Sequence, residues 1–497
     1  MMKMMKTRTT TMKTTNRLAA LALLAGLCGS AGASELTDAA NADWLELVRR
    51  YTSADTLTQA EDSYRWSRLV QDSSAHSDSF LAEWWKMLGD DTLTGLIDSA
   101  FESNRDFRSA RAKVLEARAQ LGVTASATRP RAEGRAEYTH GRNSDAEDPD
   151  LKSYNKYALG IDASWELDLF GRSRHNLDAA KADLEAEYAT LHDGWVSLSA
   201  EVAVNYITLR TLQNRLESLR KNAELQAEIL EMLESKYNAG MTDALAVQQE
   251  RYTLEHTRSE IPALEQSIQE TMNALAVLTG QVPGSLNARL SEVAALPRAE
   301  DSRLIGIPAE TLRQRPDVRA AERRLAAQIS TRKAAEKAAY PTIALIGSIG
   351  LESLSTGDMF SSGGYGFTIG PRVTWPIFNG GEVRKNIAVQ SAVEEQLAAE
   401  LEGVILRAVG EVRDALSANV QELVRNERLK SGLTAARDAL SIAREKYARG
   451  LVGFGDVLTS QQAVYSAEDE CIASDGQKVI NMVRLFKSLG GGWLKME

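Results

Sequence analysis

The residue types that most often carry chemistry form no catalytic or metal-binding pattern in this sequence. No common metal motif has the spacing of the 5 histidines, which are His76, His140, His175, His192 and His256. The sequence also contains neither a glycine-rich phosphate loop nor a nucleophile elbow. We therefore expect a protein that is not an enzyme and that needs no cofactor or metal.

Composition narrows the class of protein further. The formal net charge is −10, which argues against nucleic acid as a partner. After the N-terminal region, no run of about eighteen apolar residues occurs, so apolar membrane-spanning helices are not expected. The chain is therefore either soluble or a β-barrel protein.

The N-terminus is typical of an export signal. Basic residues precede the apolar stretch 18–27, and Ala31-Gly32-Ala33 forms a cleavage signature. Because this stretch is too short for a transmembrane helix, a removed signal peptide at 1–33 is favoured over a retained anchor.

The two cysteines have different expected roles. Cys28 lies inside the signal and could accept lipid after cleavage, but Leu27 stands where a bacterial lipobox has a small side chain. We therefore favour cleavage without lipidation. Cys471 is then the single thiol of the mature chain, and its simplest role is a small buried apolar side chain on a helix.

The sequence repeats itself at an offset of about 210 residues. Four residues return without a gap, since Trp165, Gly171, Arg174 and Asn176 match Trp375, Gly381, Arg384 and Asn386. At the same offset, Lys236-Tyr-Asn-Ala-Gly240 returns as Lys446-Tyr-Ala-Arg-Gly450. Further on, three extra residues in the second copy are predicted from the match of Asp243, Gln249 and Tyr252 to Asp456, Gln462 and Tyr465.

We interpret the chain as a tandem duplication. The first repeat spans 93–285 and the second spans 308–490. The remaining parts are an N-terminal segment at 34–92, which the export signal would place in the periplasm, a linker at 286–307 and a C-terminal tail at 491–497.

Each repeat is expected to contain the same elements in the same order. A helix rich in Ala, Arg and Glu comes first, at 93–128 and 308–339. A hydrophobic period of two then predicts a strand pair, at 131–140 with 156–169 and at 342–352 with 365–377. Leucines at intervals of seven predict a supercoiled helix about 95 Å long at 172–236, with a counterpart at 384–446. A Tyr-x-x-Gly turn then reverses the chain into a return helix, at 243–280 and 456–489.

Each predicted strand has one apolar and one polar face, the pattern of a transmembrane β-strand. A soluble sheet packed on helices is the alternative, but the export signal and the long helices favour the membrane. Trp165 and Trp375 lie at equivalent strand ends, where they would join either an interfacial aromatic girdle or a core. Four strands cannot close a barrel, so the membrane interpretation requires oligomerisation.

Several motifs resemble those of one known family. The motifs are Trp84-Trp85, Ser164-Trp-Glu-Leu-Asp-Leu-Phe-Gly-Arg172, Ile307-Pro308, Arg315-Pro-Asp-Val-Arg-Ala-Ala-Glu322, Trp375-Pro-Ile-Phe-Asn-Gly-Gly381, Tyr447-Ala-Arg-Gly450 and Leu489-Gly-Gly-Gly-Trp493. Together these motifs are spread over nearly the whole mature chain. They resemble the TolC-like outer membrane factors, especially the RND-associated branch that serves drug-efflux pumps.

The resemblance implies a mixed α/β membrane protein that assembles as a homotrimer. Each chain would give four strands to a twelve-stranded transmembrane β-barrel and long coiled-coil helices to a periplasmic α-barrel. The implied location is the outer membrane of a Gram-negative bacterium, in contact with its lipid. The implied partners are a periplasmic adaptor (membrane fusion) protein and an inner-membrane pump, for which the proton-driven class is favoured. The duct would passively conduct drugs or other toxic compounds to the outside.

The resemblance places the functional positions at the two turns. Gly240 and Met241 in the first turn, and Gly450, Leu451 and Val452 in the second, resemble the tip residues that receive the adaptor. Glycine permits the tight reversal between helices whatever else the turn does.

The gate-forming positions that the resemblance implies are Asp243, Tyr447 and Asp456. In a trimer each acid would form a ring of three carboxylates and so an electrostatic constriction. Both aspartates have a simpler alternative role as N-caps of the return helices. The second turn also carries Gly453-Phe454-Gly455, so the two turns are expected to contact adaptors differently.

Two other functions fit part of the pattern. An exit channel for type I protein secretion would share the duct architecture. A periplasmic coiled-coil structural or adaptor protein would use the helices, but it would not need the four alternating strands.

Overall fold

The computed structural model describes residues 83–142, 153–297, 314–355 and 364–492. The predicted signal peptide, Cys28 and most of the segment 34–92 lie outside the described residues.

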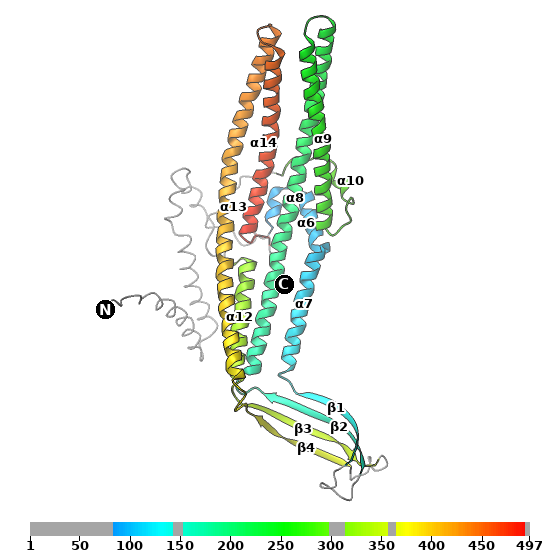
Figure 1. The fold of residues 1–497 in the computed structure, drawn as a ribbon, viewed down its shortest axis with the longest axis vertical. Helices are drawn as coiled ribbons and strands as arrows, with labels where there is room; N and C mark the ends of the chain where they lie inside the picture. The colour runs from blue at the N-terminus through cyan, green and yellow to red at the C-terminus, as the bar shows by residue number, and fades with distance from the viewer. Residues whose placement is uncertain (1–82, 143–152, 298–313, 356–363, 493–497) are drawn as a thin grey trace, which may run out of the picture. The chain divides into compact units, whose positions relative to one another are not determined.

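The first half of the described chain begins with a short 3-10 helix and two α-helices, followed by two strands and a helical hairpin (Figure 1). These elements are η1 (Trp84–Leu88), α6 (Asp91–Ser103), α7 (Arg105–Ser126), β1 (Arg131–Gly141), β2 (Tyr154–Leu167), α8 (Arg172–Asn238) and α9 (Ala244–Leu278). A one-turn helix, α10 (Asn287–Leu290), follows in the region predicted as a linker. The second half contains α12 (Pro316–Lys337), β3 (Thr342–Ser353), β4 (Tyr365–Thr374), α13 (Glu382–Ala448) and α14 (Phe454–Ser488).

The two halves have the same helix lengths. The helices α8 and α13 have 67 residues each, and α9 and α14 have 35 each. Both pairs start 210 residues apart, so the prediction of three extra residues in the second copy is wrong. Similar side chains recur every three to four residues on one helix face, which is why a match shifted by three residues looked convincing. The structural counterpart of Asp243 is therefore Gly453, not Asp456.

The helix predicted at 93–128 is divided into α6 and α7 at Asn104. The backbone of Asn104 is extended, and its side-chain oxygen accepts a hydrogen bond from the Phe107 amide at 2.9 Å. Its amide group also donates to the Leu278 carbonyl at 2.9 Å. Asparagine is a strong N-cap, so it starts a new helix where the periodicity alone predicts a continuous one.

Two strands end earlier than predicted. The strand β2 ends at Leu167, because Asp168 accepts hydrogen bonds from the amides of Ser173 and Arg174 at the start of α8. The strand β4 ends at Thr374, and Pro376 cannot donate to a strand ladder.

The four strands form one antiparallel sheet in the order β1-β2-β3-β4. The register aligns the apolar residues of neighbouring strands, since Leu159 pairs with Leu351, Ile161 with Ile349, and Ile349 in turn with Phe367. Because side chains alternate between the faces of a strand, this register gathers the apolar residues on one face of the sheet.

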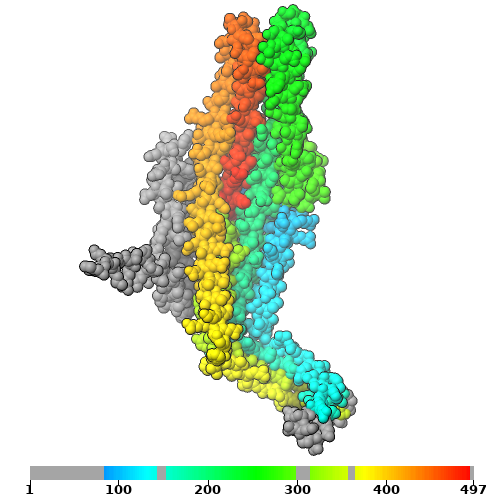
Figure 2. Space-filling model, viewed as in Figure 1, coloured from blue at the N-terminus to red at the C-terminus, as the bar shows by residue number. Residues whose placement is uncertain are grey.

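The helices pack around two cores. The larger core contains Trp84, Trp85 and Phe101 with parts of α8, α9 and α14. A smaller core near the turns contains Leu233 of α8, Val247 of α9, and residues of α13 and α14. Figure 2 shows the two hairpins in contact in this region, with α8 and α9 in green and α13 and α14 in orange to red. We call this four-helix region the tip core; its buried members are Leu233, Ala246, Val247, Leu440, Ala443, Phe454, Val457 and Val464.

Candidate functional site

The two turns at the ends of the hairpins have the same backbone structure. Gly240 and Gly450 have φ angles of 71° and 73°, a conformation that favours glycine. In the first turn the Met241 amide donates to the Lys236 carbonyl at 2.8 Å, and the Gly240 amide donates to the Tyr237 carbonyl at 2.9 Å. The second turn repeats both bonds, so each long helix ends in a Schellman motif.

The turns present apolar side chains at their outer ends. Met241 and Leu451 are each 68% exposed, and Val452 is half-buried. The residues for which adaptor contact is predicted therefore include two large apolar side chains that no part of the described chain covers.

Asp243 and Asp456 have different local roles. Asp243 is the N-cap of α9, and its carboxylate accepts a hydrogen bond from the Ala246 amide at 3.0 Å. Asp456 lies within the first turn of α14, whose N-cap is Gly453, so the N-cap alternative is wrong for Asp456. Both aspartates are exposed, and their roles in a gate stay predictions.

Tyr447 packs between the two hairpins. Its ring makes an edge contact with Phe454 of α14 at a centroid distance of 5.7 Å. Lys236 Nζ, from α8 in the other hairpin, lies 5.4 Å from the centre of the same ring, within range of a cation–π interaction. In the described part of the chain no hydrogen bond or ion pair joins Tyr447 to Asp243 or Asp456, so the three predicted gate residues form no direct cluster within one chain.

Trp165 and Trp375 occupy equivalent positions at strand ends: Trp165 is near the end of β2, and Trp375 directly follows β4. The Trp165 indole donates to the Thr128 carbonyl at 3.0 Å, and the Trp375 indole donates to the Ala339 carbonyl at 3.2 Å. The two rings are 38% and 59% exposed, so neither is buried within the chain. Each tryptophan links a strand end to the end of the preceding helix, and the membrane-interface role stays a prediction.

The polar face of the sheet carries charges of both signs. Arg135 lies 3.3 Å from Asp162 on the neighbouring strand, and Lys156 lies 2.8 Å from Glu352. The opposite face carries uncovered apolar side chains, among them Phe367 at 67% and Ile369 at 71% exposure. The sheet therefore has one charged face and one apolar face.

Several buried polar residues were missed by the sequence analysis. Gln226, Glu250 and Gln461 have no exposed surface, and all three keep polar atoms without a hydrogen-bond partner. Burial raises the pKa of Glu250 to about 7. One signal was available, because Gln226 interrupts the leucine series of the long helix; the burial of Glu250 depends on which helices cover it.

Three of the motifs that are distant in the sequence meet in the larger core. Trp84 stacks on Phe486 at a centroid distance of 5.6 Å. A Cβ added to Gly492 would lie 3.2 Å from the Trp84 indole nitrogen, and one added to Gly490 would lie 3.1 Å from Cγ of Arg315. The glycines near the C-terminus therefore let the chain pass closely over the tryptophan and arginine motifs.

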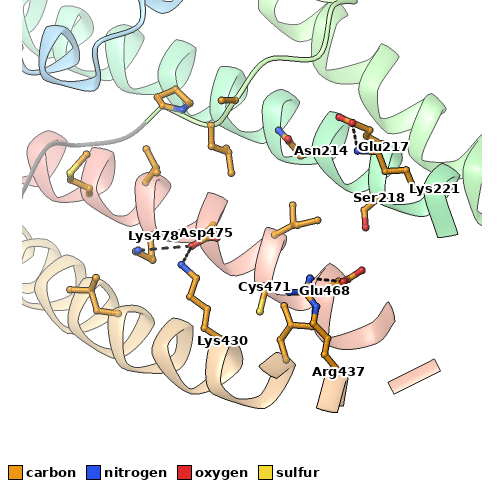
Figure 3. Close-up of a pocket in the computed structure, with 18 of the residues that line it drawn as sticks. Asn214, Glu217, Ser218, Lys221, Lys430, Arg437, Glu468, Cys471, Asp475 and Lys478 are labelled. Atoms are coloured by element: carbon orange, nitrogen blue, oxygen red, sulfur yellow. Dashed lines mark hydrogen bonds and ion pairs between the residues drawn. The ribbon is translucent and has the colours of Figure 1, made fainter. Parts of the chain in front are cut away.

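A groove of about 1060 Å³ lies between α8, α13 and α14 (Figure 3), and Pro297 is among the residues that line it. Its charged groups pair with one another, since Lys430 lies 2.9 Å from Asp475 and Arg437 lies 2.7 Å from Glu468. Cys471 lines the groove but is only 6% exposed on α14, which confirms the prediction of a small buried side chain. We assign no ligand to this groove.

The described ranges contain neither a cluster of metal ligands nor an apolar membrane-spanning helix. No group of three or more histidine, cysteine, aspartate or glutamate side chains there is arranged to hold a metal ion. None of the helices described there has both the length and the hydropathy needed to cross a membrane.

Known proteins are similar to this chain in sequence and in fold. The profile of the outer membrane efflux protein family matches residues 96–281 and 307–491, one match for each repeat. The toluene efflux pump outer membrane protein TtgF of Pseudomonas putida is 30% identical over 82% of this chain and 85% of its own length. The cation efflux system protein CusC of Escherichia coli is 28% identical over 83% of this chain and 88% of its own length.

A solved structure agrees with these matches. The outer-membrane channel OprN is 31% identical and superposes with a TM-score of 0.79, over 87% of this chain and 98% of its own. The four-stranded sheet and the paired helical hairpins of this chain thus superpose on the fold of a solved outer-membrane channel. This chain belongs to the outer membrane efflux protein family.

Proposed function

We propose that three copies of this chain form an outer-membrane exit duct that passively conducts small molecules delivered by an inner-membrane pump. The strands of each copy contribute to one twelve-stranded barrel, and the helical hairpins form a periplasmic tunnel that closes at the turns. The duct performs no chemical step, so it needs no catalytic residues and no cofactor.

The observation that carries the proposal is the uncovered apolar face of the sheet. A contiguous apolar surface is unfavourable in water and normally marks a membrane or partner contact. The strands have 10 to 14 residues, which is long enough to cross the hydrocarbon layer when tilted. A soluble scaffold gives no reason for such a face.

The edges of the sheet support assembly of several copies. The strands β1 and β4 each have one neighbour within the described chain, and unpaired strand edges are not tolerated in lipid. Two copies would supply eight strands, and side chains fill the interior of a barrel of that size. Three copies would give a wider interior, suited to the passage of a small molecule.

The names of the relatives support small molecules as cargo, rather than a secreted polypeptide. One relative is named for toluene and another for cations, so the family frame serves chemically different cargoes. We therefore propose small-molecule efflux without assigning a cargo class.

The turns are the proposed place of contact with a periplasmic adaptor. Met241 and Leu451 are exposed apolar side chains at the ends of two rigid hairpins, as expected of a docking surface. Asp243 and Asp456 lie beside them and would place carboxylates around the closed end of the tunnel.

The test is the native mass of the protein extracted in detergent from purified outer membranes, followed by conductance measurements in planar bilayers. We expect a trimer that forms ion-conducting pores. A monomer or dimer in the soluble periplasmic fraction, or an outer-membrane trimer that forms no pores, would overturn the proposal.

A further inference from the structure

The tip core is bordered by a carboxyl group that has no partner. Glu250 of α9 has no exposed surface, and neither of its carboxylate oxygens has a hydrogen-bond partner. Gln226 of α8 and Gln461 of α14 are also fully buried and keep unpartnered polar atoms. Buried polar atoms are almost always satisfied in folded proteins, so a buried carboxylate with both oxygens unpartnered requires a reason.

Glu250 lies where the two hairpins meet. It follows Val247 by three residues on the buried side of α9, and Val247 belongs to the tip core together with Val457 and Val464 of α14. Tyr465 of α14 is close enough for the Glu250 carboxylate to affect it. Burial raises the pKa of Tyr465 to about 12, and the charge of Glu250 adds to that rise. Separation of the hairpins would therefore give Glu250 access to water.

No neighbouring charge compensates Glu250 within the described residues. Arg251, the next residue of α9, pairs with Glu234 of α8 at 2.8 Å, and Glu468, which like Glu250 influences Tyr465, pairs with Arg437 of α13 at 2.7 Å. Of the other ionisable groups here, Arg444 of α13 is exposed, and Tyr465 is neutral at physiological pH. Burial is the single cause of the raised pKa of Glu250.

We propose that Glu250 is a proton-sensitive element of the closed tip, holding the two hairpins together when its carboxyl is neutral and favouring their separation when it is charged. This inference rests on the proposed function, because it assigns the hairpin separation to opening of the duct. The position 210 residues later is Ser460, so each chain carries one such carboxyl, on its first hairpin.

The direction of the pH effect follows from the burial of the group. The pKa of Glu250 is about 7 when packed and near its ordinary value of 4.5 when solvated, so the packed state binds the proton more tightly. Packing is therefore fully favoured below pH 4.5, weakens as the pH rises through about 7 and changes no further above it. The difference corresponds to roughly a three-hundredfold change per chain in the balance between packed and separated hairpins over the whole titration.

The test uses the full-length protein in detergent and in planar bilayers between pH 5 and pH 8. Hydrogen exchange of the amides in 246–254 and 457–465, corrected for the intrinsic rate at each pH, reports hairpin separation, and single-channel recordings report opening. The variants are Glu250→Gln and Glu250→Met, which remove the charge in two ways. Glu255→Gln is the matched control, because it removes the same charge from an exposed position of the same helix.

We expect corrected exchange and open probability to rise with pH in the wild type and in Glu255→Gln, by up to roughly a hundredfold, and to stay flat in both Glu250 variants. Wild-type and Glu250 variants with the same pH dependence would overturn the role of Glu250 while leaving the duct intact. Proteins that form no pores in any variant would instead overturn the proposed function, and the exchange data would still report whether Glu250 controls packing.

Discussion

The helices α8 and α14 approach each other closely at Gly476 of α14, and this approach gives a quantitative prediction. A Cβ built on Gly476 would lie 2.1 Å from the Thr211 hydroxyl oxygen, 2.9 Å from its methyl carbon and 3.0 Å from its Cβ. The Thr211 hydroxyl also donates to the Ile207 carbonyl at 2.8 Å. Rotation of the Thr211 side chain can relieve only part of the clash, because its Cβ would stay 3.0 Å from the added methyl group and its hydroxyl and methyl both point toward it. Replacement Gly476→Ala must therefore push α8 and α14 apart.

Two opposing effects set the size of the change. Alanine is favoured over glycine in a helix interior by about 1 kcal/mol. Overpacking of a well-packed core costs about 1–3 kcal/mol, and separated helices also lose neighbouring contacts. We expect a net loss of about 1–2 kcal/mol in the free energy of unfolding. The double variant Thr211→Ala with Gly476→Ala removes the two shortest contacts and should recover most of the loss.

The assay is the apparent melting temperature of the detergent-extracted protein, followed by tryptophan fluorescence at one fixed protein concentration. Gly432→Ala on α13 is the control, because no atom lies within 4 Å of the added methyl group and only the gain in helix propensity remains. The expected order of stability is Gly432→Ala, wild type, the double variant and then Gly476→Ala. If Gly476→Ala has the same melting temperature as Gly432→Ala, α8 and α14 do not approach each other closely at Gly476.

Three further predictions concern the turns and the larger core. Asp243→Ala should lower the free energy of unfolding by about 1 kcal/mol through loss of the N-cap, and Asp456→Ala should lower it distinctly less in the same melting assay. If the carboxylates form a gate, both variants should also raise the single-channel conductance. Unchanged single-channel currents in both variants would exclude Asp243 and Asp456 from the gate. Leu451→Glu should abolish pump complementation while native gels show normal trimer levels, and normal efflux would exclude docking at this turn. Arg315→Met should lower the free energy of unfolding by about 2–4 kcal/mol, because it removes hydrogen bonds to Asp317, Glu411 and the Ser488 carbonyl. Arg315→Lys should lose less stability than Arg315→Met but should not reach the wild type. A wild-type melting temperature in Arg315→Met would refute this role of Arg315.

Periodicity was sufficient to predict most of the regular structure. The helix α8 begins at Arg172, the residue from which the leucine repeat predicts a helix, and β1 and β3 begin where the alternating pattern begins. A period of two or seven depends on local geometry, so it can be read without knowing what lies opposite. Turn glycines are equally local, because the positive φ angles of Gly240 and Gly450 are requirements of the backbone itself.

Features that depend on a distant segment could not be predicted in this way. The break at Asn104 is stabilised partly by the Leu278 carbonyl, 174 residues away in the sequence. Glutamate is typical of exposed helix positions, and the burial of Glu250 depends on how α9 packs beside the tip core. The shift of three residues in the second repeat was wrong for a related reason, since similarity of side chains on a helix does not fix the register of the backbone.

The two hairpins share a backbone plan but differ in chemistry, and the difference bears on how the tip works. Asp243 caps α9, whereas its counterpart Gly453 has no side chain to cap α14. Tyr237 is 49% exposed. Its counterpart Tyr447 packs against Phe454, and Lys236 of the other hairpin lies over the face of its ring. The first hairpin thus supplies the cap, the cation and the buried acid, while the second supplies the aromatic ring that receives the cation. Duplication keeps the helix lengths equal, and the unequal side chains concentrate the contact between the hairpins at Lys236, Tyr447 and Phe454, which is where the proposed opening of the tip would have to separate them.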